Sequence, residues 1–145
     1  MKKLLKVFVI YILFFCSSFS LADDNKQKIQ NIYKLLQEKK FEEGIKNLQI
    51  LSEYNEINAQ LLYSKILFSG DLTPQDFENS YFWGFSALLG GLKKSSNILV
   101  KLEKYLTEKQ IEEITIKLRE FLEKRVFAKD KRAIIQVAKI YEKFT

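Results

Sequence analysis

The chain has 145 residues, of which 47% are hydrophobic, with 24 lysines and arginines against 18 aspartates and glutamates and no histidine. This length suits one domain with a core of its own. Without histidine and with one cysteine, the sequence excludes the usual zinc sites, a Ser-His-Asp triad and a Cys-His pair, so we expect neither a metal nor another cofactor.

Residues 1–22 are typical of a secretory signal peptide, with three lysines, the apolar run Val7–Phe15 and small residues before a cleavage site after Ala22. The run is shorter than the roughly 20 apolar residues of a spanning helix, which favours cleavage over an uncleaved anchor. Lipidation of Cys16 is disfavoured because a phenylalanine precedes it. We expect a periplasmic or secreted chain with no stable membrane span after signal cleavage.

The charge of the expected mature chain is uneven. Removing residues 1–22 removes three lysines and no acidic residue, leaving 21 basic against 18 acidic residues and a net charge of +3. Residues 23–92 carry 7 basic and 10 acidic residues (−3), whereas residues 93–145 carry 14 and 8 (+6). The basic C-terminal part favours an acidic partner.

From Asn25 onward, apolar residues recur three and four positions apart without sustained strand alternation, which predicts an all-α fold. Short polar connections favour antiparallel neighbours. Of the seven expected helices, the first two carry apolar stripes at Ile29–Leu36 and Phe41–Leu51. The others lie at about 57–69, 74–89 and 95–106, from Thr107 onward, and at about 130–144.

Several helix ends carry local signals. Gly70 suits the left-handed residue that closes a helix. Thr73 is expected to cap the next helix, with Asp76 in its first turn. Thr107 and Gln110 have the spacing of a capping box. The last helix is expected to bury Ile134, Val137, Ala138 and Tyr141.

Residues 59–91 combine small residues, turn residues and one tryptophan at fixed spacings, carried by Ala59, Ser64, Gly70, Pro74, Asp76, Ser80, Trp83, Ala87 and Gly91. In this the segment resembles the Sel-one-like repeat, a family of two-helix repeats close to the tetratricopeptide repeats. The stretch Phe41–Ile45, with Gly44 at a small position, looks like part of a tetratricopeptide hairpin. The resemblance implies a short right-handed α-solenoid: a tetratricopeptide-like hairpin at 23–56, a Sel-one-like repeat at 57–92, and a degenerate repeat with a capping helix at 93–145.

The candidate catalytic or ligand-stacking residues have simpler structural interpretations. Trp83 is expected to pack beside small residues rather than stack on a ligand. Asp76 is explained by its place in a first helical turn. Glu112 and Glu113 are adjacent, so on a helix they diverge by about 100° and cannot form the opposed pair of a glycosidase. The same angular argument applies to Asp76 and Glu78.

The strongest charge feature after residue 22 is a basic cluster. A solvated surface is its plainest interpretation; contact with an acidic protein or an anionic lipid surface is a second, and nucleic acid, which an exported chain rarely meets, is disfavoured. Three acidic residues, Glu120, Glu123 and Asp130, lie beside or within the run. Its members are Lys124, Arg125, Lys129, Lys131 and Arg132.

The resemblance implies an exported interaction module, an adaptor or scaffold of the bacterial cell envelope rather than an enzyme, binding a protein or peptide segment on its repeat surface. Gln60 and Lys65 are the expected groove residues, because they fall off the packing face of their helix. The alternative is a small periplasmic hydrolase that uses carboxylates alone, which would require a convergent, buried carboxylate pair.

Overall fold

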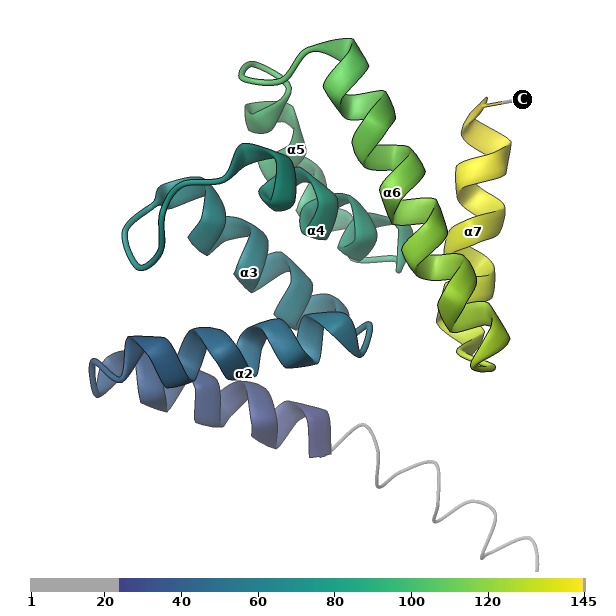
Figure 1. Cartoon of the computed structure of the whole chain (residues 1–145). Coiled ribbons are helices and arrows are strands. Elements are labelled where there is room, and N and C mark those ends of the chain that lie inside the picture. The colour runs from purple at the N-terminus through teal and green to yellow at the C-terminus, as the bar shows by residue number, and fades with distance from the viewer. Residues whose placement is uncertain (1–23, 145) are drawn as a thin grey trace, which may run out of the picture.

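The computed structural model describes residues 24–144 and confirms the prediction of an all-α fold, since this part of the chain forms seven α-helices, one 3-10 turn and no strand (Figure 1). The expected signal peptide, Cys16 and the cleavage site after Ala22 lie outside the described residues. No helix within residues 24–144 is long and apolar enough to cross a membrane. In chain order, the elements are a helix at 24–37, α2 (Phe41–Glu53), α3 (Ile57–Ser69), α4 (Phe77–Leu89), a 3-10 turn (Lys93–Ser95), α5 (Ser96–Leu102), α6 (Glu108–Phe127) and α7 (Lys131–Phe144).

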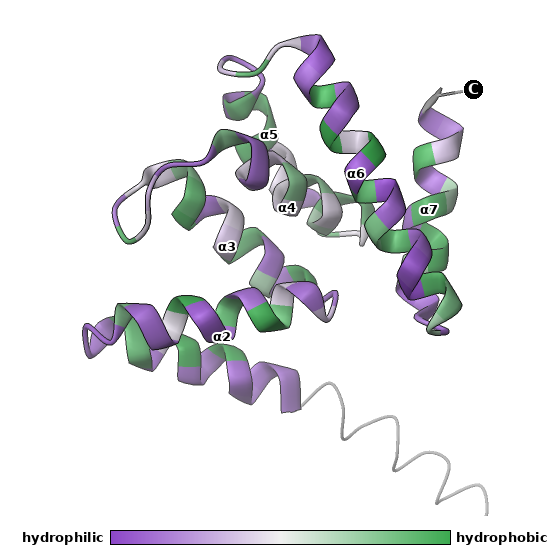
Figure 2. Ribbon diagram, viewed as in Figure 1, coloured by the Kyte–Doolittle hydropathy of each residue, from purple (hydrophilic) through white to green (hydrophobic). Residues whose placement is uncertain are grey.

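The helices stack in sequence from the N-terminal hairpin toward α7 (Figure 1). Helix α3 packs between α2 and α4, while α4 also contacts α5, α6 and α7. Helix α7 lies along α6. Figure 2 shows the hydrophobic residues interspersed with hydrophilic ones along most helices, as expected for elements that bury only part of their circumference. The result is a short helical stack with α4 at its centre.

Small residues bring α3 and α4 into close contact. The Ser64 hydroxyl donates to the Ser80 carbonyl oxygen at 2.7 Å, and the Ser80 hydroxyl donates to the Ser64 carbonyl oxygen at the same distance. A Cβ atom on Gly84 would lie 2.9 Å from Ser64 Oγ. Ala59 and Ala87 are fully buried. These two backbones approach closely because no large side chain stands between them.

The core has two parts. The larger lies among α3, α4, α5, α6 and α7, and the smaller lies between the N-terminal hairpin and α3. Trp83 is 8% exposed, and its ring meets those of Phe82 and Phe121 edge-on, with centroids 4.8 and 5.6 Å away. The prediction that Trp83 packs in the interior is therefore confirmed.

Two predicted helix ends are confirmed. Gly70 has φ 73 and closes α3 in the left-handed conformation. Thr107 and Gln110 form a capping box at the start of α6, in which the Thr107 hydroxyl accepts from the Gln110 N–H and the Gln110 side chain accepts from the Thr107 N–H. Both ends were readable because their chemistry is local.

The predicted start of α4 is wrong. The helix begins at Phe77, and its N-cap is Asp76 rather than Thr73. The Asp76 carboxylate accepts from the Asn79 N–H at 2.9 Å, while the Asp76 N–H donates back to the Leu67 carbonyl oxygen at 3.0 Å. After α3 the chain folds back beside that helix before α4 begins. Residues 74–76, which were expected to form the first turn of α4, belong to this connection.

Two further predictions need correction. The fifth helix ends at Leu102, before the expected residue 106. The packing face of α7 is rotated from the expected one: Ile134 and Tyr141 are each 50% exposed, Ala138 is exposed and Val137 is half-buried. The polar residue Gln136 stands at the centre of the observed packing face, so the spacing of the apolar residues predicted the wrong face. The face consists of Ala133, Gln136 and Ile140, which are at most 3% exposed.

Candidate functional site

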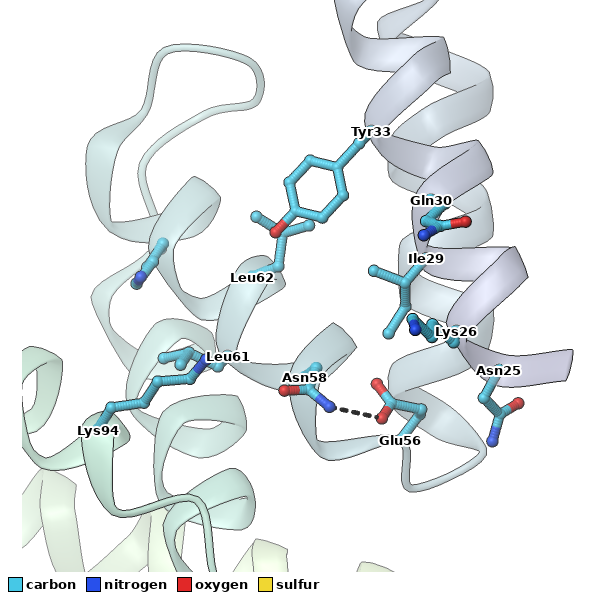
Figure 3. Close-up of a pocket in the computed structure, with 11 residues that line it drawn as sticks. Asn25, Lys26, Ile29, Gln30, Tyr33, Glu56, Asn58, Leu61, Leu62 and Lys94 are labelled. Carbon is cyan, nitrogen blue, oxygen red and sulfur yellow. Dashed lines mark hydrogen bonds between the residues drawn. The ribbon is translucent and has the colours of Figure 1, made fainter. Parts of the chain in front are cut away.

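A hollow of about 430 Å³ lies between the N-terminal helix and α3. Figure 3 shows Tyr33 and Ile29 on the N-terminal helix facing α3, with Lys94 reaching toward the hollow from the 3-10 turn. Its walls therefore come from the first helices of two consecutive hairpins and from the start of the next unit. The lining residues are Asn25, Lys26, Ile29, Gln30, Tyr33, Glu56, Asn58, Leu61, Leu62, Lys65 and Lys94.

The lining of this groove combines an apolar base with positive charge. Lys26, Lys65 and Lys94 are exposed, and none of them forms an ion pair with another described residue. The half-buried side chains of Ile29 and Leu62 supply the aliphatic surface of the lining, and the buried Leu61 lies at its base. A groove of this kind can take a segment that carries both carboxylate and apolar side chains.

The carboxylate of the single acidic residue in the lining already accepts hydrogen bonds from α3. Glu56 is 8% exposed and is the N-cap of α3. One of its carboxylate oxygens accepts from the Ala59 N–H at 2.6 Å, and the other accepts from the Asn58 amide at 3.1 Å (Figure 3). Its charge is directed at the helix terminus, which leaves the three lysine ammonium groups to face solvent.

Of the two predicted groove residues, Lys65 lines the groove and Gln60 does not. Gln60 is fully buried, and its amide nitrogen donates to the Ser52 carbonyl oxygen and to Asn55 Oδ1, each at 3.1 Å. The prediction of Gln60 is wrong because α3 is covered on two sides, by α2 and by α4. A side chain that does not face one of these helices can therefore still be buried against the other. Helical spacing from Lys65 could have found Leu61, Leu62 and Asn58.

The predicted basic cluster divides into two kinds of residue. Arg125 pairs with Asp130 at 3.0 Å and also donates to the Glu53 carbonyl oxygen. Arg132 donates to the carbonyl oxygen of Asn55. The two arginines therefore bind turns of the protein itself, and the expectation that the whole cluster is a free surface is wrong for them. Lys124, Lys129 and Lys131 are exposed.

Asn55 connects the α2–α3 turn to the C-terminal hairpin. It is 1% exposed with φ 61, and its amide nitrogen donates to Asp130 Oδ2 at 3.1 Å and to Gln136 Oε1 at 2.8 Å. Burial alone would raise the pKa of the Asp130 carboxyl, but the hydrogen bonds from Asn55 and Arg125 outweigh it and hold this pKa below its ordinary value. No local sequence signal links these residues, which are 75 or more positions apart.

The remaining acidic candidates serve separate local roles. Asp76 caps α4, and Glu78 accepts from the Gln110 amide at 3.1 Å. Glu113 faces Lys109 at 3.8 Å, and Glu112 lines a smaller hollow of about 260 Å³ beside α7. Within residues 24–144, no three acidic or cysteine side chains are grouped so that they could hold a metal ion.

Comparisons with protein-family models, with curated proteins and with solved structures find no match to this chain. The groove is therefore interpreted from its own geometry.

Proposed function

We propose that this chain is an exported Sel-one-like repeat protein that acts as an interaction module of the bacterial cell envelope and binds an acidic protein segment in the groove between the N-terminal helix and α3. The observation that carries the proposal is a set of three lysines around an aliphatic base, Lys26, Lys65 and Lys94, none of which pairs with a carboxylate within residues 24–144. The lysines come from three successive units of the stack, so an extended segment could contact all of them at once.

The chemistry of the groove sets the kind of ligand. Exposed ammonium groups attract carboxylates over a distance of about 8 Å at physiological ionic strength. Such rim charges mainly select the partner and speed association, while aliphatic contacts supply part of the affinity. The fitting ligand is a protein segment with several aspartates or glutamates and at least one apolar side chain.

Two fluorescent synthetic peptides can test this proposal: one alternates glutamate with leucine and the other alternates lysine with leucine. We expect the protein to bind the acidic peptide and not the basic one, as measured by fluorescence anisotropy. The double variant Lys65→Glu/Lys94→Glu should weaken binding by about tenfold or more, because attraction becomes repulsion.

The matched control is Lys101→Glu/Lys117→Glu, which makes the same change in net charge at exposed positions outside the groove. It should bind the acidic peptide like the natural chain. Equal loss in both variants would show that only overall charge matters, and equal binding of both peptides would contradict the proposal.

A further inference from the structure

The turn between α6 and α7 presents an aromatic side chain to solvent. Phe127, the last residue of α6, is 89% exposed. Tyr54, which is 72% exposed, lies on the α2–α3 turn, and that turn is hydrogen-bonded to this one through Arg125 and Asn55. Phe127 lines neither of the two hollows described above. Because so little of its side chain is covered, Phe127 forms a protruding tip.

Unpaired positive charge surrounds this tip. Lys124 lies one helical turn before Phe127 on the same face of α6, and Lys129 and Lys131 follow within four residues. None of these three lysines forms an ion pair with a described residue. Most nearby carboxylates already have partners. Asp130 pairs with Arg125, and Glu123 accepts from the Tyr141 hydroxyl and lies 3.8 Å from Arg119. The Glu53 carboxylate beside the adjoining turn accepts from the Gln49 amide, which leaves Glu120.

The turn is held in one conformation. The Asp130 carboxylate accepts from the N–H groups of Arg132 and Ala133 at the start of α7, and its other oxygen binds Arg125 and Asn55. Lys129 has φ 62, which places it in the left-handed conformation of a tight turn. Phe127 is thus presented by a braced element, so little conformational freedom is lost when it meets a surface.

From these observations we infer that the α6–α7 turn docks on an anionic lipid surface, with Phe127 entering the headgroup region and Lys124, Lys129 and Lys131 contacting lipid phosphates. An aromatic side chain flanked by lysines matches the chemistry of such a surface, which is apolar beneath a negative layer. A convex tip with one aromatic suits a soft surface that it can enter, whereas a protein partner would need a complementary pocket. This inference is independent of the proposed function of the groove.

Fluorescence of the exported chain can test this inference. The variant Phe127→Trp places a reporter at the tip, and the natural Trp83 is buried and serves as the background. With vesicles that contain phosphatidylglycerol, we expect a blue shift of the emission from position 127 and quenching by brominated acyl chains. Vesicles of phosphatidylcholine alone should give neither change.

Two controls separate the tip from other modes of binding. Val100→Trp, at a position that is 60% exposed on α5, should show no blue shift even if another part of the chain holds the protein on the vesicle. Changing Lys124, Lys129 and Lys131 to glutamine should weaken the affinity for anionic vesicles, measured from the emission at position 127, by about fivefold per lysine. Lys101→Gln/Lys117→Gln should leave it unchanged.

Two results would overturn the inference. One is an emission from Phe127→Trp that is the same with and without anionic vesicles. The other is a blue shift of equal size with soluble polyglutamate, which would assign the tip to an acidic protein instead.

Discussion

Removal of the Trp83 side chain should cost a large part of the stability of the fold. It is 8% exposed and packs edge-on against Phe82 and Phe121, so it joins α4 to α6. We expect Trp83→Ala to lower the free energy of unfolding by about 3–5 kcal/mol, the range for deleting a large buried aromatic. Denaturant titration measures this, and with a total stability of only about 5–15 kcal/mol the variant will be close to unfolding.

The matched control is Val100→Ala, at a side chain that is 60% exposed. It should change the unfolding free energy by no more than about 0.5 kcal/mol. A loss of less than about 1 kcal/mol in Trp83→Ala would contradict the interior role of this ring.

At the scale of elements, the contact between the α2–α3 turn and the α6–α7 turn should make stability depend on pH. The pKa of Asp130 is lowered in the folded chain, so the folded state favours the ionised carboxylate. This contribution is present above the ordinary carboxyl pKa and is lost as the pH falls through the lowered value, so unfolding should become easier below about pH 4.

Chemical denaturation at a series of pH values measures this effect. Asp130→Asn should be less stable than the natural chain at neutral pH, and the difference should shrink as the solution is acidified. Glu112→Gln, which alters an exposed carboxylate on α6, should leave the pH dependence nearly unchanged. A difference for Asp130→Asn that stays constant down to acid pH would contradict the role of the charge.

Sequence prediction succeeded where a feature depends on residues close together in the chain and failed where it depends on distant ones. Gly70 and the Thr107–Gln110 box were readable because a helix end depends on residues within one turn. Gln60 and Gln136 were not, because each is a polar residue buried against partners outside its own helix. Only part of the groove could be predicted. The position of Lys65 on α3 indicated that it lines the groove, whereas Lys94 lies there only because of how the 3-10 turn packs.

At the scale of the whole molecule, the proposal of export predicts a defined product. We expect the protein recovered from outside the cytoplasm to begin at Asp23, because the apolar run before it is short and ends in small residues. Intact-mass analysis decides this. A product that retains Met1, or one that carries acyl chains on Cys16, would contradict the prediction.

The hydrogen bonds of Asn55 to Asp130 and Gln136 also change how the stack can come apart. In a linear array, each unit touches only its neighbours, so the terminal helix can fray by itself. Here α7 cannot leave without stranding the buried amide of Asn55. We therefore expect α7 to open together with the α2–α3 turn rather than by itself, so that the amide protons of α7 and of this turn exchange at similar rates.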